Sequence, residues 1–443
     1  MMTIEGKGPF SEGIRSYSEV NREICVEGSI HRIRDMGKFA FVVIRTSRSL
    51  VQCVMDRDSC VINGLESGRS LMEGDCIRVW GEKVDEARAE GGFEVHISRI
   101  DVLSHADSIS PLNLSKNKIG ASLEVMLENR PIALRHPHER AIFKLQEGIV
   151  EAFRSYLSDH DFTEIHSPKI TSASAEGGAN IFKLDYFGQP ATLAQSPQLY
   201  KQMMVGVFGR VFEVASVFRA EKHNTTRHLN EYVSMDFEMG FINGIYDIMD
   251  TEIAVLRHIM SYLNEHYSHE LQILDVILPV IGDIPVLKFR EAKELIVKEY
   301  GKRLGGFGDL DPEEEVLLCE YAASKLGSEF IFITHFPSSR RPFYVMDDVN
   351  DQGYAFSFDL LFRGLEITTG GQRIHDYNMQ VKKMQDMDLD PSEFDSYLSI
   401  HKHGMPPHGG LGLGLERLEM QLLNLNNVRY TSLFPRDIKR IKP

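Results

Sequence analysis

Apolar and polar residues alternate in short runs through the first hundred or so residues of the chain. Five stretches are rich in Val, Ile and aromatic residues and are separated by turn-rich segments: 24–34, 38–46, 49–56, 75–84 and 93–103. A period of two is typical of strands that bury one face. Five such strands predict a small β-barrel of the OB type, and a fragment of a β-sandwich is the alternative.

The pattern changes to a helical period beyond residue 135. From His136 onwards, apolar residues recur at spacings of three and four: Ile142, Leu145, Ile149, Phe153 and Leu157. This spacing predicts an amphipathic helix. Two later helices are expected at 246–267 and 414–425, and mixed strands and helices are expected between them.

Composition supports a folded chain of two or three domains. Hydrophobic residues make up 42% of the 443 residues, which is enough for sizeable cores. Residues 105–135 follow neither period. We therefore expect a barrel domain at 1–104, a linker at 105–135 and a domain of class α+β at 136–443.

Charge and cysteine usage narrow the class of protein. The net charge of -15 argues against a non-specific coat for nucleic acid, although a local basic groove is still compatible with it. The five cysteines form no CxxC pair, no apolar run reaches the length of a membrane span, and the N-terminus lacks the apolar stretch of a signal peptide. We expect a cytoplasmic protein without a disulfide framework.

Candidate chemistry begins with a cationic loop between two apolar-looking strands at 210–239. In the second strand, Met235 and Phe237 alternate with Asp236 and Glu238, so the acidic residues should face away from the core. The strands are expected to pair antiparallel and to carry five polar side chains on an open face: Arg219, Glu221, Tyr232, Asp236 and Glu238. Because arginine binds phosphate and an aromatic ring stacks on a base, this is a candidate nucleotide site; a solvated hairpin is the alternative.

A second hairpin is expected within 357–376. A tight turn near Phe362 and Arg363 would make Asp359 and Glu366 cross-strand neighbours. Like charges placed opposite each other are unfavourable, and a divalent cation would remove the conflict. Mg²⁺ commonly bridges carboxylates to phosphates. The sequence therefore indicates a Mg²⁺ site here, with two carboxylates facing water as the alternative.

A glycine-rich strand follows near the C-terminus. Gly409, Gly410, Gly412 and Gly414 would let a ligand approach the backbone closely. Arg417 comes at the start of the next helix, and the N-terminus of a helix favours anions.

Three features in this order resemble the signature motifs of class II aminoacyl-tRNA synthetases: a strand stopped by Pro168, the hairpin with Arg219 and Glu221, and the glycine strand that leads to Arg417. The resemblance covers nearly the whole chain. With a barrel ahead of the catalytic domain, the chain is similar to the subgroup for aspartate, asparagine and lysine, and most similar to the aspartate-specific enzymes of archaeal and eukaryotic type. It implies a catalytic domain built on an antiparallel sheet flanked by helices.

The resemblance implies an ATP site of seven residues. Arg219 would bind the α-phosphate and Arg417 the γ-phosphate, and these two would carry catalysis. Glu221 would hydrogen-bond the adenine and Tyr232 would stack on it. Arg227 and His228 would contact the triphosphate tail. Asp359 and Glu366 would hold Mg²⁺, the expected cofactor, with Glu366 also at the ATP.

The resemblance also implies an amino-acid site. Lys201 and Arg373 would face the side-chain carboxylate of aspartate, assisted by Gln198. Asp236 and Glu176 would bind the ammonium group, and the segment around Glu176 resembles a mobile loop. In the barrel, Arg34, Phe41 and Gln52 match the anticodon-reading positions of these enzymes.

The expected reaction is the ATP-dependent attachment of L-aspartate to tRNA(Asp) through an aspartyl-adenylate. The sequence leaves open whether tRNA(Asn) is also charged, since Ser29 matches neither the strict nor the relaxed pattern. The resemblance places Pro168 and the preceding helix at a homodimer interface. The alternatives are an asparagine-specific enzyme, an adenylate ligase that has lost tRNA, and a non-catalytic RNA-binding paralogue.

Overall fold

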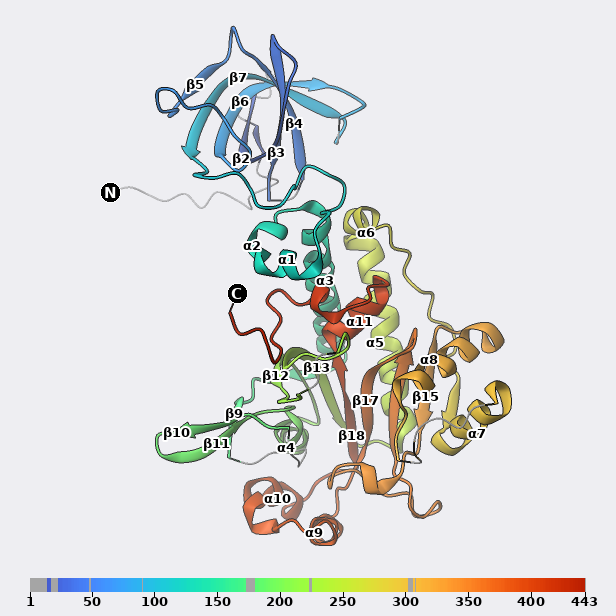
Figure 1. Cartoon of the computed structure of the whole chain (residues 1–443). Coiled ribbons are helices and arrows are strands. Elements are labelled where there is room, and N and C mark those ends of the chain that lie inside the picture. Colours follow the sequence, from blue (N-terminus) through green and yellow to red (C-terminus); the bar gives the residue numbers. More distant parts are fainter. Residues whose placement is uncertain are drawn as a thin grey trace. The chain divides into compact units, whose positions relative to one another are not determined.

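The structure is a computed structural model that describes residues 14–16, 23–47, 49–89, 91–172, 180–222, 225–301, 306 and 308–442. It divides into two compact units, Met1–Arg140 and Ala141–Pro443. Figure 1 shows the course of the chain through both units. Each unit is described by itself below.

The first unit contains a closed five-stranded barrel within its described residues. Its strands are β2 (Glu23–Asp35), β3 (Phe39–Arg45), β4 (Leu50–Asp56), β6 (Cys76–Asp85) and β7 (Phe93–Ser104). The pairs β2–β3, β3–β4, β6–β7 and β2–β6 are antiparallel and β4–β7 is parallel, so the sheet closes on itself. The predicted OB-type barrel is confirmed, and each of the five predicted stretches forms one strand. Two short strands, β1 (Ile14–Ser16) and β5 (Val61–Asn63), were not predicted.

Alternation along the strands separates the barrel core from an outer face. Ala40, Val42 and Ile44 of β3 are fully buried. The residues between them point outwards, so Phe41 lies on the outer face. The segment expected to be a linker contains two short helices, α1 (Leu123–Glu128) and α2 (Arg130–Ala133).

The second unit is built on an eight-stranded sheet within the described residues. Its order is β14–β15–β16–β17–β18–β13–β12–β8. The strands are β8 (Thr163–Glu164), β12 (Arg210–Phe218), β13 (Glu231–Gly240), β14 (Val286–Lys288), β15 (Phe330–Thr334), β16 (Ser357–Phe362), β17 (Leu365–Arg373) and β18 (His408–Gly414). Only the two end pairs of this sheet, β14–β15 and β12–β8, are parallel among the described strands. The predicted antiparallel sheet with helices is confirmed.

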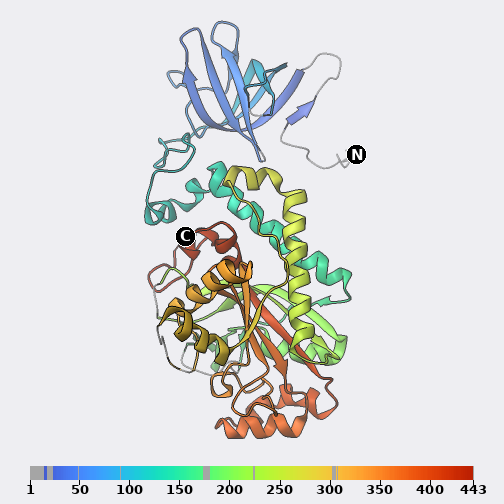
Figure 2. The same ribbon diagram turned by 90° about the vertical axis from the view of Figure 1, so that its right-hand side faces the viewer.

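Helices α3 (Pro137–Asp159) and α5 (Ile245–His266) lie on one side of this sheet (Figure 2). The five apolar residues predicted to form the buried stripe of α3 are all buried, in one core with Phe237 and Leu411 of the sheet. On the opposite side, α7 (Phe289–Tyr300) and α8 (Pro312–Tyr321) pack against Ile331, Ile333 and Leu361. Helices on both faces explain why β15 and β16 are buried throughout.

The remaining elements border the sheet. They are β9 (Ile170–Thr171), β10 (Lys183–Tyr186), β11 (Gln189–Leu193), α4 (Gln198–Phe208), α6 (Ser268–Leu274), α9 (Tyr377–Asp386), α10 (Asp395–Lys402) and α11 (Leu415–Leu422). The first three form a separate small sheet. No helix in the described part of the chain is long and apolar enough to cross a lipid bilayer.

Candidate active site

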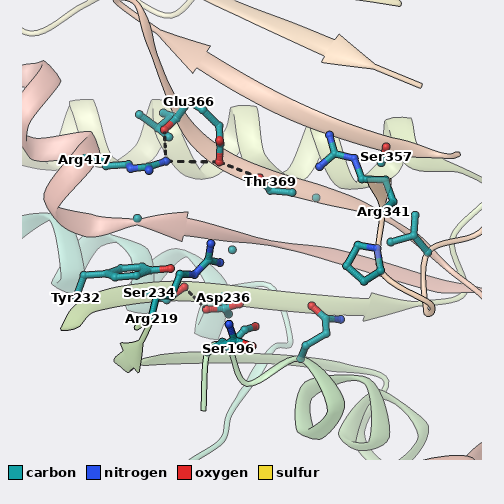
Figure 3. Close-up of a pocket in the computed structure, with 18 of the residues that line it drawn as sticks. Ser196, Arg219, Tyr232, Ser234, Asp236, Arg341, Ser357, Glu366, Thr369 and Arg417 are labelled. Atoms are coloured by element: carbon teal, nitrogen blue, oxygen red, sulfur yellow. Dashed lines mark hydrogen bonds and ion pairs between the residues drawn. The ribbon is translucent and has the colours of Figure 1, made fainter. Parts of the chain in front are cut away.

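A pocket of about 520 Å³ opens on the side of the large sheet that faces away from α3 and α5. Its floor is formed by β13, β17 and β18, and its rim by the loop after β12 and the start of α11. Figure 3 shows charged side chains from these separate segments pointing into one space. All seven residues predicted for ATP line this pocket: Arg219, Glu221, Arg227, His228, Tyr232, Glu366 and Arg417.

The cationic loop differs from its prediction in one respect. Strand β12 ends at Phe218, so Arg219 and Glu221 lie in the loop and not on the strand face. Asn230 holds them there, because its side-chain Nδ2 donates to the carbonyl oxygens of Arg219 at 2.8 Å and Glu221 at 2.9 Å. The Arg219 guanidinium lies 5.9 Å from the centre of the Tyr232 ring. A cation therefore stands beside an aromatic surface.

His228 and Arg227 extend this end of the pocket. His228 Nε2 lies 3.7 Å from Glu221 Oε2. Arg227 pairs with Glu315 of α8, and Glu315 also accepts a hydrogen bond from the backbone N of Glu366 at 2.9 Å. Sequence reasoning missed Glu315, and no local signal could have found it, since α8 precedes β17 by some fifty residues of chain.

Arg417 enters from the first turn of α11, as predicted. Its Nη1 donates to the carbonyl oxygen of Glu366 at 3.0 Å and lies 3.6 Å from Glu366 Oε1. The preceding residue, Glu416, accepts from the backbone N of Val233 at 3.1 Å with both carboxylate oxygens. Burial raises the pKa of Glu416 to about 8.

Asp359 and Glu366 were expected to lie opposite each other on neighbouring strands, and this is wrong. The turn between β16 and β17 is at Arg363 and Gly364, and an irregularity between Leu360 and Leu361 shifts the pairing. As a result Glu366 lies opposite Leu361, and Asp359 lies opposite Thr369. A β-bulge adds one residue to a strand and displaces all partners beyond it.

The two carboxylates nevertheless influence each other. Burial raises the pKa of Asp359, and the charge of Glu366 raises it further against the opposing effect of Arg341. Burial also acts to raise the pKa of Glu366, but Arg417, the hydrogen bond from Thr369, Arg219 and Arg341 together outweigh it, and the net shift is downwards.

The donor set is compatible with a divalent cation that is shared with a phosphate. Asp359 Oδ2 accepts from Arg341 Nη2 at 3.0 Å, whereas its buried Oδ1 has no hydrogen-bond partner among the described residues. Mg²⁺ usually takes one or two carboxylates together with phosphate oxygens and water. The described residues contain no group of three or more His, Cys, Asp or Glu side chains able to hold a metal ion by themselves. Arg341 lines the pocket and was not predicted.

The other end of the pocket carries the residues predicted for the amino acid. Lys201 Nζ lies 2.9 Å from Asp236 Oδ1 and 3.4 Å from Glu238 Oε2, and it donates to the carbonyl oxygen of Leu411 at 2.8 Å. Arg373 Nε donates to Glu238 Oε1 at 2.8 Å. Its Nη2 lies 3.4 Å from Gln198 Oε1.

The acidic face of β13 was expected to be open, and this is wrong. Asp236 is 2% exposed and Glu238 is fully buried, because the side chains of Lys201 and Arg373 cover them. Glu238 belongs to the site because it is the shared counter-ion of Lys201 and Arg373. The alternation along β13 predicted which side of the strand Glu238 faces, but it did not predict these two partners. Glu176, the remaining residue predicted for the amino acid, lies outside the described residues.

Three predicted anticodon residues share the outer face of the barrel. Arg34 of β2 is the strand partner of Phe41 of β3, and Gln52 of β4 is the partner of Val43. Arg34 is exposed and Phe41 and Gln52 are half-buried. Gln52 Nε2 donates to Glu94 Oε2 at 2.9 Å, and Phe39 meets Phe41 edge-on with 5.5 Å between ring centres.

Comparisons with known families assign both parts of the chain. The family described as tRNA synthetases class II (D, K and N) matches residues 122–438. The family described as OB-fold nucleic acid binding domain, an anticodon-binding family, matches residues 24–103.

Relatives match over almost the full length. The chain is 45% identical to an Aspartate--tRNA(Asp/Asn) ligase of Deinococcus radiodurans, with 95% of each chain covered. It is 38% identical to an Aspartate--tRNA(Asp) ligase of Pyrococcus horikoshii, covering 95% of this chain and 96% of the relative.

Solved structures share the fold. An asparaginyl-tRNA synthetase from Pyrococcus horikoshii complexed with asparaginyl-adenylate matches with a TM-score of 0.87 at 29% identity, covering 96% of each chain. A putative aspartyl-tRNA synthetase from Leishmania major matches with a TM-score of 0.84 at 29% identity, covering 96% of this chain and 92% of the other.

Proposed function

The chain belongs to the class II tRNA synthetases of the group for aspartate, lysine and asparagine, and we propose that it activates L-aspartate with ATP and transfers it to tRNA(Asp). The observation that carries the choice of aspartate is the convergence of Lys201 and Arg373 at one end of the pocket, with Gln198 beside them. Two fixed cations favour a carboxylate side chain over its amide analogue.

The charges at this end of the pocket suit the rest of the amino acid. Asp236 is the described carboxylate proposed to bind the ammonium group, and it lies on the pocket floor within reach of Lys201. Glu238 holds both selecting cations from below. The site therefore offers cations to a carboxylate and an anion to an ammonium.

The opposite end of the pocket suits ATP. Arg219 is proposed to contact the α-phosphate and Arg417 the γ-phosphate, with Arg227 and His228 along the triphosphate. The Tyr232 ring is proposed to stack on the adenine, which Glu221 would hydrogen-bond. These residues line one wall of the same pocket as Lys201 and Arg373, so both substrates can meet there.

The chemistry follows from this arrangement. The carboxylate of aspartate attacks the α-phosphorus, the aspartyl-adenylate forms, and pyrophosphate leaves. The arginines hold the phosphates in line for this displacement and stabilise the charge that develops on their oxygens. Mg²⁺ held by Asp359 and Glu366 would add charge neutralisation at the phosphates. The terminal ribose hydroxyl of the tRNA then attacks the activated carbonyl, and AMP leaves.

The barrel is proposed to read the anticodon. Phe41 offers a ring on which a base can stack, and Arg34 and Gln52 offer hydrogen-bond donors beside it. We also propose a symmetric homodimer with Pro168 and α3 at its two-fold interface. A monomeric mass by light scattering, with full activity, would contradict the dimer.

The experiment that tests the function has two steps. Exchange of pyrophosphate into ATP is measured with each of the twenty amino acids, and charging is then measured with purified tRNA(Asp) and tRNA(Asn). Exchange with aspartate alone supports the proposal. Equal exchange with asparagine overturns the choice of amino acid, and the absence of any exchange overturns the activity itself. The second tRNA decides whether one tRNA or both are charged.

A further inference from the structure

A buried glutamate on α8 joins two segments at the end of the pocket that is proposed for ATP. Glu315 is 7% exposed, and one of its carboxylate oxygens, Oε2, accepts two hydrogen bonds. The first comes from the guanidinium of Arg227, in the loop after β12. The second comes from the backbone N of Glu366, near the start of β17, over 2.9 Å. One oxygen therefore contacts both a residue proposed for the triphosphate and a residue proposed for Mg²⁺.

Helix α8 is fixed at the turn that carries Glu315. The side chain of Asp311 accepts from the backbone N of Glu314 at 3.0 Å, and the side chain of Glu314 accepts from the backbone N of Asp311 at 2.9 Å. This reciprocal cap fixes the beginning of the helix. One turn later Leu318 is fully buried, in the same core as Leu361 of β16. The cap and the core together fix the place from which Glu315 reaches its two partners.

Glu366 is held at three of its polar atoms. Its backbone N donates to Glu315, and its carbonyl oxygen accepts from Arg417 Nη1 at 3.0 Å. Its Oε1 accepts from the hydroxyl of Thr369 at 2.9 Å, and Figure 3 shows the contacts with Arg417 and Thr369. Mg²⁺ requires near-ideal octahedral geometry, so the orientation of a carboxylate ligand and the groups that hold it affect how well the ion binds.

Arg227 is held by Glu315 and keeps donors for a ligand. Its side chain lines the pocket, and its bond to Glu315 is made by Nη2. Its Nε is buried and has no hydrogen-bond partner among the described residues. Burial acts to raise the pKa of Glu315, and the charge of Arg227 is the largest effect that opposes the rise. A long arginine side chain loses rotamer freedom when a ligand orders it, and a partner that orders it beforehand lowers this cost of binding.

We propose that Glu315 is a positioning residue for the activation step, which holds the guanidinium of Arg227 ready for the triphosphate and the backbone of Glu366 ready for Mg²⁺. This inference rests on the proposed function, because it takes Arg227 and Glu366 as contacts of ATP and Mg²⁺. Glu315 is not among the residues that line the pocket, so it acts through these two partners. A carboxylate behind Arg227 could instead draw the guanidinium away from the phosphates, and loss of its charge would then strengthen ATP binding.

Two substitutions separate the two partners of Glu315. Glu315→Gln removes the charge that pairs with Arg227 but keeps an oxygen that can accept from the backbone N of Glu366. Glu315→Leu removes both. Glu320→Gln changes an exposed glutamate of the same helix and is the control. Each variant is measured as the full chain, by pyrophosphate exchange with aspartate and by calorimetry of ATP binding in the presence of Mg²⁺.

Glu315→Gln should lower kcat/KM for ATP roughly ten- to a hundredfold and weaken ATP binding in the calorimeter, because Arg227 loses a charge-assisted hydrogen bond. Its Mg²⁺ dependence should stay close to that of the wild type. Glu315→Leu should also require more Mg²⁺, and Glu320→Gln should match the wild type throughout. Tighter ATP binding by Glu315→Gln would overturn the positioning of Arg227, and wild-type Mg²⁺ dependence in Glu315→Leu would overturn the positioning of Glu366.

A double variant tests whether Glu315 acts through Arg227. If it does, Glu315→Gln combined with Arg227→Gln should have a kcat/KM for ATP within about twofold of that of Arg227→Gln alone. A general disturbance of the fold would instead multiply the two single losses, and that result would overturn the inference. Thermal melting shows whether each variant folds. If Glu315→Gln does not fold, Glu315→Asp, which keeps the charge on a shorter side chain, takes its place and should show the same non-additivity.

The wild type separates this inference from the proposed function. The absence of aspartate-dependent exchange in the wild type would overturn the proposed function. Normal exchange in the wild type, with unchanged ATP kinetics in both Glu315→Gln and Glu315→Leu, would overturn the positioning role alone.

Discussion

The guanidinium of Arg373 donates from Nε to Oε1 of Glu238 over 2.8 Å, and Glu238 has no exposed surface. Lys201 reaches the second oxygen of this carboxylate at 3.4 Å. Burial acts to raise the pKa of Glu238, but Arg373 and Lys201 outweigh it and the net shift is downwards. Glu238 is therefore charged at neutral pH and holds in place both cations that are proposed to select aspartate.

Glu238→Gln should destabilise the fold by about 3–5 kcal/mol, because one change leaves two buried cations without their shared counter-ion. The free energy of unfolding is measured by urea denaturation at neutral pH. Glu265→Gln, an exposed glutamate of α5, is the control and should change the stability very little. Equal stability of wild type and Glu238→Gln would show that this carboxylate does not hold the two cations.

Arg373→Leu should lower kcat/KM for aspartate by a factor on the order of 10³ to 10⁴, because the substrate carboxylate loses a fixed cationic partner. It should not gain asparagine, since leucine offers the amide no hydrogen bond. The KM for ATP should change much less, since the proposed phosphate contacts are on Arg219 and Arg417. Pyrophosphate exchange, measured with aspartate and asparagine in parallel, gives kcat/KM for aspartate, the activity with asparagine and the KM for ATP. Near-normal aspartate kinetics in this variant would remove Arg373 from the amino-acid site.

Glu366→Gln should reduce adenylate formation by roughly a hundredfold or more and shift its dependence on Mg²⁺ to higher concentration, because a neutral amide is a weak Mg²⁺ ligand. Calorimetry of Mg²⁺ binding in the presence of ATP gives a readout besides activity. Glu329→Gln is a control, since Glu329 pairs with Arg363 and does not line the pocket. Wild-type metal dependence in Glu366→Gln would exclude Glu366 as a ligand.

Phe41→Ala should raise the KM for tRNA by about five- to a hundredfold, because a stacked base contributes about 1–3 kcal/mol. Gln52→Ala should raise it as well, while pyrophosphate exchange stays near the wild-type rate in both. Phe39→Ala removes the neighbouring ring and should have the smaller effect. A loss of exchange as large as the loss of charging would show that the barrel is not a separate anticodon-binding domain.

Stability should fall as the pH rises from about 4.5 towards 8, with Glu252 as one cause. Both oxygens of its buried carboxyl lack hydrogen-bond partners in the described part of the chain, and burial raises its pKa from the usual value of about 4.5 to about 8. Between these values the unfolded chain releases the proton and the folded chain keeps it, so the folded state loses its advantage as pH rises. Below pH 4.5 the Glu252 carboxyl makes its full contribution to the stability of the folded state, and above pH 8 this contribution is lost.

The variant Glu252→Gln tests whether Glu252 makes the stability fall as the pH rises. The glutamine stays neutral, so the variant should show a flatter stability curve between pH 5 and 8 and should exceed the wild type at high pH, by up to about 4 kcal/mol. Urea denaturation midpoints at both ends of the window measure the effect, with Glu265→Gln of the same helix as the control. A parallel loss of stability in wild type and Glu252→Gln would assign the pH dependence to other groups.

Much of the fold could be predicted because its signals are local. A period of two located all five barrel strands, and a period of 3.6 located the buried stripe of α3, from Ile142 to Leu157. The same parity along β13 separated Met235 and Phe237 from Asp236 and Glu238. These patterns depend only on which side of an element faces the core.

The register of β16 and β17 could not be predicted from the turn alone. Asp359 and Glu366 were expected to be partners. The turn at Arg363 and Gly364 places Glu366 opposite Leu361, and the bulge between Leu360 and Leu361 places Asp359 opposite Thr369. A bulge of this kind depends on how the strands pack with their neighbours, which no local spacing reports.

The side chains that could supply the chemistry were recognisable from their spacing along the chain: the arginines at 219 and 417, the lysine at 201 and the arginine at 373, together with the elements that carry them. Their pairing became visible when these elements packed together. The tertiary structure buried Glu238 beneath Lys201 and Arg373, set Glu315 against Arg227 and Arg341 against Asp359. Buried charges require partners, and the partners of these charges come from elements far apart in the chain that meet only when the sheet and its helices pack.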